Sequence, residues 1–266
     1  MINMNNITIV LPIRIENEDR LENVKTVLLW LDKMDVPIIL LEADKTPYLK
    51  GIIAKYKHVT YHFVKDPNDV FHRTKYINML LLMSSTDMVA VWDADIILPK
   101  LQLKHAVELM IEHHATIVYP YNGKILMLSQ KQSKTFRKTN NLFSLQSMSI
   151  NPLMGRTACG GVYIVNRKKY LLLGGDNEKF IGWGPEDAER LHRIQIAGEI
   201  ALWLNTGVIY HLYHQRTEHE GANFYANLLT MRKEFVKVCS LNREEMLAYI
   251  QNELVPTQIR NHEQHI

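Results

Sequence analysis

Hydrophobic positions follow two alternating patterns over the first 120 residues of the chain. Short apolar runs, which are typical of buried strands, occur at 7–11, 36–41, 59–64, 88–92 and 116–119. Longer segments with apolar residues at helical spacing lie between them, at 20–33, 48–56, 74–84 and 103–113. Strands that alternate with helices predict an α/β fold with a mostly parallel, doubly wound central sheet.

The pattern is less regular in the second half of the chain. Residues 121–156 are polar and predict a long loop or weak helix, a kind of segment that often forms a lid. Further strands are expected at 162–165, 200–204 and 208–213, and further helices at 185–196, 223–238 and 243–254. No repeat or low-complexity linker divides the chain, so we expect one domain over residues 1–266.

Composition narrows the class of protein only a little. The 266 residues are 47% hydrophobic, which is enough for a full core, and the net charge of +3 is a mild excess. Five basic residues lie between Lys124 and Lys138. Such a segment is most often a solvated loop, and the alternatives are contact with a phosphate, an anionic glycan or a membrane surface. No recognisable nucleic-acid-binding motif is present, so a nucleic acid is not an expected partner.

The cysteines and the ends of the chain bear on location. Cys159 and Cys239 provide neither a disulfide framework nor the spacing of a metal site, which favours a reducing compartment. The sequence shows no signal peptide and no transmembrane segment. We therefore expect a cytoplasmic protein, with peripheral association to the inner face of a membrane as an open alternative.

Two acidic residues follow the buried run 88–92. These are Asp93 and Asp95, separated by Ala94. Packing does not require acids at this place, although a helix cap is one alternative reading. In an open α/β sheet, ligands bind at the carboxyl ends of the strands, and carboxylate oxygens suit a divalent cation that carries a phosphate. The pair therefore indicates an enzyme that acts on a nucleotide diphosphate.

Two later segments carry further candidate chemistry. Glycines flank Trp183, and Glu186 and Asp187 open the predicted helix that follows. This arrangement is either simple helix capping, with the Trp in the core, or a sugar platform next to a general base. His211 and His214 would point in opposite directions along a strand, so they can share one metal ion only if the strand has ended between them. A purely structural histidine is the commoner case, but beside a carboxylate site either becomes a plausible Mn²⁺ ligand.

Four motifs, in this order, resemble those of the beta-1,4-galactosyltransferases, which are inverting enzymes with the Rossmann-like GT-A fold. They are Leu11-Pro12-Ile13-Arg14, the segment from Phe71 to Asn78, Trp92-Asp93-Ala94-Asp95, and Gly160-Gly161-Val162 followed by the segment from Gly182 to Asp187. The resemblance covers roughly residues 7 to 216. It implies a nucleotide-binding part at 7–120 and an acceptor and catalytic part at 121–216. The C-terminal helical extension at 217–266 is not explained by the resemblance.

The resemblance implies a role for each matching residue. Asp95 would bind Mn²⁺, or alternatively Mg²⁺, together with His211 or His214, and different placements of the family pattern favour different histidines. Asp187 would be the base that deprotonates the acceptor hydroxyl, with Glu186 holding the sugars. The donor would be bound by Pro12, Arg14, Phe71, Arg73, Asp93, Ala94, Asp95, Gly161 and Trp183.

Two departures from the family pattern concern the substrates. Ala188 stands where many members have a further acid that helps to hold an acceptor GlcNAc, which counts against that acceptor. Ala158 stands where the vertebrate galactose enzymes have a Tyr packed against the donor sugar. The smaller side chain leaves space for an N-acetyl group, so UDP-GalNAc is a donor alternative to UDP-galactose.

The expected function is metal-dependent, inverting transfer of galactose or N-acetylgalactosamine from a UDP-sugar to a glycan hydroxyl, in the synthesis of a bacterial surface polysaccharide. One alternative is a nucleotidyltransferase, which would need a glycine-rich phosphate loop near the N-terminus. Residues 13–17 contain no glycine, which counts against it. The other alternative is a non-catalytic relative that binds a UDP-sugar or a glycan. The intact acidic residues and histidines argue against a dead enzyme.

Overall fold

A computed structural model describes residues 4–146, 150–153, 157–215 and 222–254. Its centre is a seven-stranded sheet in the order β10-β6-β9-β4-β1-β2-β3. All neighbouring strands are parallel except β9, which is antiparallel to both β4 and β6. The mostly parallel α/β sheet predicted from the sequence is confirmed. The strands are β1 (Ile7–Ile13), β2 (Ile38–Asp44), β3 (Val59–Lys65), β4 (Met88–Trp92), β6 (Ile117–Tyr119), β9 (Val162–Asn166) and β10 (Ala201–Trp203).

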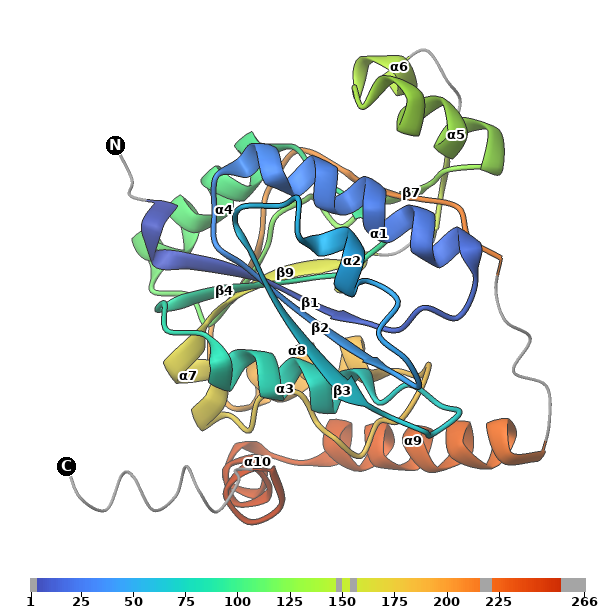
Figure 1. The fold of residues 1–266 in the computed structure, drawn as a ribbon. Helices are drawn as coiled ribbons and strands as arrows, with labels where there is room; N and C mark the ends of the chain where they lie inside the picture. Colours follow the sequence, from blue (N-terminus) through green and yellow to red (C-terminus); the bar gives the residue numbers. More distant parts are fainter. Residues whose placement is uncertain (1–3, 147–149, 154–156, 216–221, 255–266) are drawn as a thin grey trace.

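Helices cover both faces of this sheet, which is why its central strands are apolar throughout. Every residue of β1 and β4 is buried. Figure 1 shows α1 (Glu18–Leu31) and α4 (Lys100–His113) on one face, and α3 (Arg73–Met83) with α7 (Arg167–Leu172) on the other. The short α2 (Lys50–Ile53) lies in the connection between β2 and β3.

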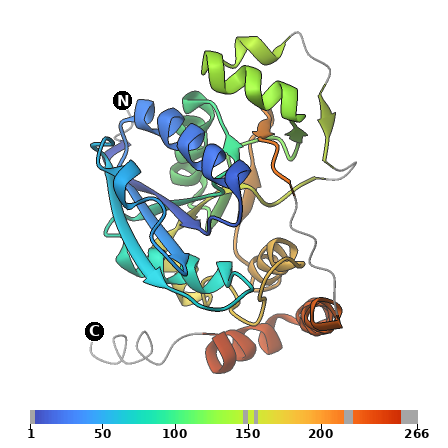
Figure 2. The ribbon, with the colours of Figure 1, turned by 45° about the vertical axis from the view of Figure 1, so that its right-hand side comes forward.

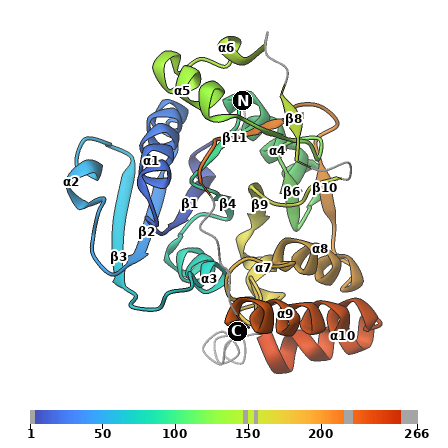
Figure 3. The same ribbon diagram turned by 90° about the vertical axis from the view of Figure 1, so that its right-hand side faces the viewer.

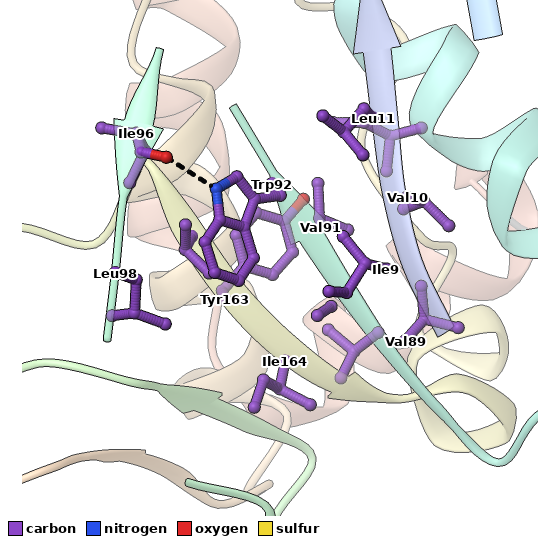
Figure 4. Packing of buried hydrophobic residues seen from close by; sticks show 14 of the residues in the cluster. Ile9, Val10, Leu11, Val89, Val91, Trp92, Ile96, Leu98, Tyr163 and Ile164 are labelled. Atoms are coloured by element: carbon purple, nitrogen blue, oxygen red, sulfur yellow. Dashed lines mark hydrogen bonds between the residues drawn. The ribbon is translucent and has the colours of Figure 1, made fainter. Parts of the chain in front are cut away.

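The indole of Trp92 fills the core directly beneath the two acidic residues. It is fully buried, and its Nε1 donates a hydrogen bond to the Ile96 carbonyl oxygen at 2.9 Å. Figure 4 shows the ring beside Tyr163 of β9, with Ile96 and Leu98 on its other side. This bond closes the chain over a single turn, so the position of Asp93 and Asp95 is fixed by the core.

A second, smaller sheet was not expected from the sequence. Its order is β5-β11-β7-β8, formed by β5 (Ile96–Ile97), β11 (Ile209–His211), β7 (Ile125–Met127) and β8 (Asn151–Pro152). Strand β5 begins one residue after Asp95, and it pairs antiparallel with β11 so that His211 lies opposite Ile96. The sheet therefore brings the first histidine next to the second acid.

Of the long loop or weak helix expected at 121–156, the structure supports the helix, and the described part of this segment also contains short strands. It contains β7, α5 (Gln130–Thr139), α6 (Phe143–Gln146) and β8. Helix α5 begins with a capping box, in which the side chains of Ser129 and Gln132 each accept a hydrogen bond from the other's backbone N–H. Phe136 anchors the helix, since it is buried with its ring 5.6 Å from that of Trp30 on α1. The suggested role of the segment as a lid stays a prediction.

The C-terminal helices pack beneath the segment that carries Glu186 and Asp187. Helix α8 (Glu186–Ile196) lies against α9 (Ala222–Ser240) and α10 (Arg243–Tyr249), which continues as a π-helix over Ile250–Leu254. Met231 of α9 is buried close to Gly184, where an added Cβ would come within 2.8 Å of its sulfur. Of the extension predicted at 217–266, residues 217–221 and 255–266 lie outside the described part. Among the described helices, none has the length and apolar character needed to cross a membrane.

Candidate active site

The predicted site residues meet at the edge where the parallel strands end, the edge that faces the viewer in Figure 3. The backbone N–H of Asp93 donates a hydrogen bond to the Gly161 carbonyl oxygen at 2.9 Å. Tyr121 donates from its hydroxyl to the Gly160 carbonyl oxygen at 2.6 Å. The Gly160–Gly161 loop is thereby held beside the two acids that follow β4.

Asp95, His211 and His214 form one cluster, which we call the metal pocket. The Nε2 atom of His211 lies 3.6 Å from one carboxylate oxygen of Asp95, and that of His214 lies 3.4 Å from the other. Strand β11 ends at His211, and the Leu212 N–H donates to the Asp95 carbonyl oxygen at 2.7 Å. The chain therefore turns between the two histidines, and this is the condition under which both can face one ion.

The donor set of the metal pocket fits a divalent transition-metal ion. One ligand atom from each of the three residues lies within 4.8 Å of the others. One carboxylate oxygen and two imidazole nitrogens suit Mn²⁺ better than Mg²⁺, which prefers oxygen ligands throughout. Burial lowers the pKa of His214, and the nearby Arg20 guanidinium lowers it further. The imidazole is thus kept neutral, which is the form that binds a metal.

Arg20 of α1 also reaches the metal pocket, which the sequence did not indicate. Its Nη1 lies 2.6 Å from the Asp95 carboxylate, and its side chain is 31% exposed. Burial alone would raise the pKa of Asp95, but His211, Arg20 and His214 together hold it below its ordinary value. Asp95 is therefore an ionised carboxylate whose charge is balanced by a partly exposed arginine.

The neighbouring Asp93 is paired with Arg73 instead. Arg73 donates from Nε at 3.1 Å and from Nη2 at 2.5 Å to the same carboxylate oxygen. Its Nη1 is buried and has no hydrogen-bond partner in the part of the chain that the structure describes. A buried guanidinium nitrogen without a partner is costly, so this atom is well placed to contact a ligand. The two acids thus have different arginine partners, Arg73 for Asp93 and Arg20 for Asp95.

Asp187 is held by a buried charge network, which we call the base pocket (Asp187, Arg190 and Asp176). Arg190 donates from Nη1 to one Asp187 oxygen at 2.9 Å. The same fully buried guanidinium donates to Asp176 from Nε at 3.1 Å and from Nη2 at 2.8 Å. The second Asp187 oxygen points at Gly160, where a Cβ atom would lie only 2.1 Å away. A glycine at this place is therefore what lets the carboxylate lie over the loop.

Glu186 and Trp183 complete the opening of α8. Glu186 accepts a hydrogen bond from the Gly184 N–H at 3.0 Å. Burial, with the nearby Asp187 charge, raises the pKa of Glu186 to about 8, so that it is mainly protonated at neutral pH. The Trp183 side chain is 65% exposed, which excludes the reading of this residue as part of the core. An exposed indole beside two carboxyl groups suits a sugar face.

Comparison with known proteins agrees with this geometry. Residues 146–215 match a family model described as the N-terminal domain of galactosyltransferase. This range contains the Gly160–Gly161 loop, the start of α8 and both histidines of the metal pocket. No curated protein sequence matches the chain.

Two solved structures illustrate the likeness in fold. Glucosyl-3-phosphoglycerate synthase from Mycobacterium tuberculosis, in complex with Mn²⁺, UDP and phosphoglyceric acid, superposes with a TM-score of 0.55 at 15% identity, covering 89% of this chain and 79% of the other. A variant of Drosophila beta-1,4-galactosyltransferase 7, in complex with manganese, UDP-Gal and xylobiose, gives a TM-score of 0.53 at 17% identity, covering 85% and 79%. The chain therefore has the GT-A fold of these glycosyltransferases, and its residues 146–215 are similar to the galactosyltransferase family.

Several of the predicted donor-binding residues hold the wall of the site together. Arg14 donates to the carbonyl oxygens of Ala43 and Asn68 at 3.0 and 2.7 Å and to Asp66 at 2.5 Å, and its guanidinium lies 5.3 Å from the centre of the Phe71 ring. It therefore ties together the ends of β1 and β2 and the loop after β3. Pro12 is buried within β1, and Ala94 is partly buried. Direct contact of these residues with a donor stays a prediction.

Three functional candidates were missed by reasoning from the sequence: Arg20, Asp176 and Arg190. The only local signal for Arg190 was its place one helical turn after Asp187, where a basic residue commonly pairs with an acid. Arg20 lies 75 residues from Asp95, and neither carried any motif that linked them. Asp176 gave no signal at all before the fold was known.

Proposed function

We propose that this protein is a Mn²⁺-dependent, inverting glycosyltransferase. It moves galactose or N-acetylgalactosamine from a UDP-sugar to a hydroxyl group of a glycan acceptor, in the synthesis of a surface polysaccharide. The observation that carries the proposal is that Asp187 lies against Gly160, while the adjacent Gly161 lies against Ile96 and Ile209, which flank the residues of the metal pocket. The metal pocket would face the leaving UDP, and Asp187 would face the attacking hydroxyl.

The metal pocket would hold the ion through Asp95, His211 and His214. When bound, a Mn²⁺ ion acts as a Lewis acid toward the diphosphate of the leaving UDP. The residues around it prepare the pocket, since Asp95 is ionised and His214 is neutral. Arg73 pairs with Asp93, and its Nη1, which has no partner among the described residues, would contact the donor.

Asp187 would accept the proton of the acceptor hydroxyl as that oxygen attacks the anomeric carbon. A new carbon–oxygen bond forms on one face of the sugar while the bond to UDP breaks on the other, and its electron pair leaves with the diphosphate. The configuration inverts in one displacement, so no covalent intermediate forms. Arg190 occupies one oxygen of Asp187, which leaves the second oxygen for the proton.

Glu186 and Trp183 would bind and orient the sugars. A protonated Glu186 can donate a hydrogen bond to a sugar oxygen, in addition to accepting one from the backbone at Gly184. The exposed indole of Trp183 offers an apolar surface to the face of a pyranose ring. Glu186 directly precedes Asp187 and Trp183 lies four residues before it, so a sugar bound by both would lie near Asp187.

Ala158 supports N-acetylgalactosamine as a donor sugar alongside galactose. Its carbonyl oxygen accepts a hydrogen bond from the Trp203 indole at 3.0 Å, and Trp203 stacks on Tyr119 with a ring separation of 4.6 Å. The backbone at this position is therefore fixed, and the methyl side chain leaves room that a larger residue would fill. Ala188 in turn supports an acceptor other than GlcNAc.

The proposal is tested by a screen of UDP-sugars in which release of UDP is followed with Mn²⁺ and with a chelator. The expected result is UDP release from UDP-Gal or UDP-GalNAc that requires Mn²⁺ and increases with acceptor. Release of pyrophosphate from a nucleoside triphosphate would instead indicate a nucleotidyltransferase. Binding of UDP and Mn²⁺ with no turnover of any UDP-sugar, with or without a panel of glycan acceptors, would indicate the non-catalytic relative.

A further inference from the structure

The charges of this protein are divided unevenly along the chain. Residues 124–156 contain six basic residues and no acidic residue. The rest of the chain holds 25 of the 31 basic residues and all 28 acidic ones, so it is net negative. The mild overall excess of +3 therefore conceals a basic segment on an acidic body. Such an asymmetry orients a protein on a charged surface.

Helix α5 presents this positive charge on one side. Lys131, Lys134 and Lys138 are exposed, and their spacing places them along one face. The opposite face carries the buried Ser133 and Phe136. Gln130 and Thr135 lie beside the lysines on the same helix. None of the three lysines has an ion pair with an acidic side chain within the described ranges, so all three ammonium groups are available.

This lysine face is rigidly attached and stands out from the body. Phe136 packs on Trp30, and Arg137 donates a hydrogen bond to the buried Asn23 of α1. Figures 1 and 2 show α5 and α6 projecting beyond the layers of the main sheet. Phe143 on α6 is 73% exposed and follows the lysines directly along the chain. The projection therefore offers both positive charge and an exposed aromatic ring.

We propose that the lysine face of α5, together with Phe143, docks on the surface of a bilayer that contains anionic lipids. Lysines attract the anionic headgroups, and an aromatic ring enters the boundary between headgroups and acyl chains. A soluble anionic polymer would satisfy the lysines but offers no apolar layer to the Phe143 ring. The lysines also line one projecting helix instead of a groove between elements, which suits a flat partner.

Docking in this way would bring the active site to the bilayer. The Tyr213 N–H, between the two histidines of the metal pocket, donates to Ser133 Oγ of α5 at 2.8 Å. Figure 3 shows α5 and α6 at the rim of the same edge that carries the site. If the proposed transfer holds, on which this step rests, an acceptor anchored in the same membrane would be presented to Asp187.

The experiment is co-sedimentation of the full chain with vesicles, without donor or acceptor. Vesicles of phosphatidylcholine alone are compared with vesicles that also contain phosphatidylglycerol. We expect binding only to the second kind, weakened by salt. The triple variant K131Q/K134Q/K138Q should bind on the order of a hundredfold more weakly. The matched control K50Q/K57Q/K65Q, which removes the same charge from exposed lysines near α2 and β3, should bind like the original chain.

Two results would overturn the proposal: no binding to anionic vesicles, whether or not a soluble sulfated polysaccharide is retained, or equal loss of binding in both triple variants. Phe143→Ser separates the apolar contribution, because it leaves the net charge unchanged and should weaken vesicle binding severalfold. The assay does not measure sugar transfer. Its result can therefore be interpreted even if the proposed transferase activity is disproved. Circular dichroism of each variant checks that α5 remains folded.

Discussion

The metal pocket and the base pocket adjoin the same glycine loop, and each contains carboxylates beside an arginine. In the metal pocket, Arg20 is 31% exposed and pairs with Asp95. In the base pocket, Arg190 is fully buried and bridges Asp187 and Asp176. A partly exposed counter-ion can be exchanged for a metal ion at low cost, whereas a buried one cannot be removed without leaving uncompensated charge. The metal pocket is therefore suited to binding an ion, and the base pocket is suited to keeping a carboxylate in a fixed position.

The largest effect is expected from breaking the base pocket at Asp176. Asp176→Asn leaves the buried Arg190 short of a charge partner and disturbs the hydroxyls of Tyr163 and Tyr170, which both donate to Asp176 at 3.0 Å. We expect a loss of about 3–5 kcal/mol in the free energy of unfolding, measured by urea denaturation. Asp69→Asn, at an exposed acid paired with Lys45, should change it by less than about 0.5 kcal/mol. Equal stability of the two variants would show that the charge network of Asp176, Arg190 and Asp187 does not stabilise the fold.

The metal pocket should lose affinity without losing stability. His211→Ala and His214→Ala are each expected to weaken Mn²⁺ binding by about a hundredfold, because removal of even an indirect partner of a ligand often costs tenfold or more. Calorimetric titration with Mn²⁺ measures this, with His58→Ala as the control at an exposed histidine. A large loss in only one variant would restrict the ligand set to that histidine and Asp95.

The protonated state of Glu186 predicts how stability depends on pH. Its folded pKa of about 8 lies above the ordinary value of 4.5, so the folded protein binds the extra proton between these values. The contribution of Glu186 to stability is therefore complete below about pH 4.5 and is lost as the pH rises through 8. Glu186→Gln should flatten this decline in thermal melts between pH 5 and 8.5. If the stability of the variant falls as steeply with pH as that of the original chain, other titrating groups cause the decline.

The smallest effect is expected at Arg20. Arg20→Met removes the cation that competes for Asp95, so Mn²⁺ should bind about twofold to fivefold more tightly when no nucleotide is present. The matched control is Arg232→Met, at an exposed position of α9. Unchanged or weaker binding of Mn²⁺ by the Arg20 variant would show that Arg20 does not compete with the metal ion for Asp95.

Local pattern was enough to predict the parts of the fold that depend on neighbours in sequence. Strands such as β1 and β4 are continuous apolar runs, and α1 has clear helical spacing, so their existence and order followed directly. The positions of Asp93, Asp95 and Asp187 at element ends were visible for the same reason. These features need no knowledge of which segments meet.

The remainder depends on contacts between distant segments. Strand β5 has two residues, too few to show a period, and it exists because it pairs with β11. The pattern predicted a strand around β11 but gave no sign of its partners. Helix α5 was partly hidden by its polar composition, although the Ser129–Gln132 capping box was present in the sequence. The Arg190–Asp176 pair forms only when the loop before α8 folds under the helix.

The central claim is that Asp187 is the base in a metal-assisted sugar transfer, and Asp187→Asn tests it most directly. Turnover of a UDP-sugar with acceptor is measured next to calorimetric binding of UDP and Mn²⁺ in the same preparation. We predict that turnover falls by a hundredfold or more, as expected for a lost general base, while both ligands bind as before. Retained turnover in this variant would contradict the account.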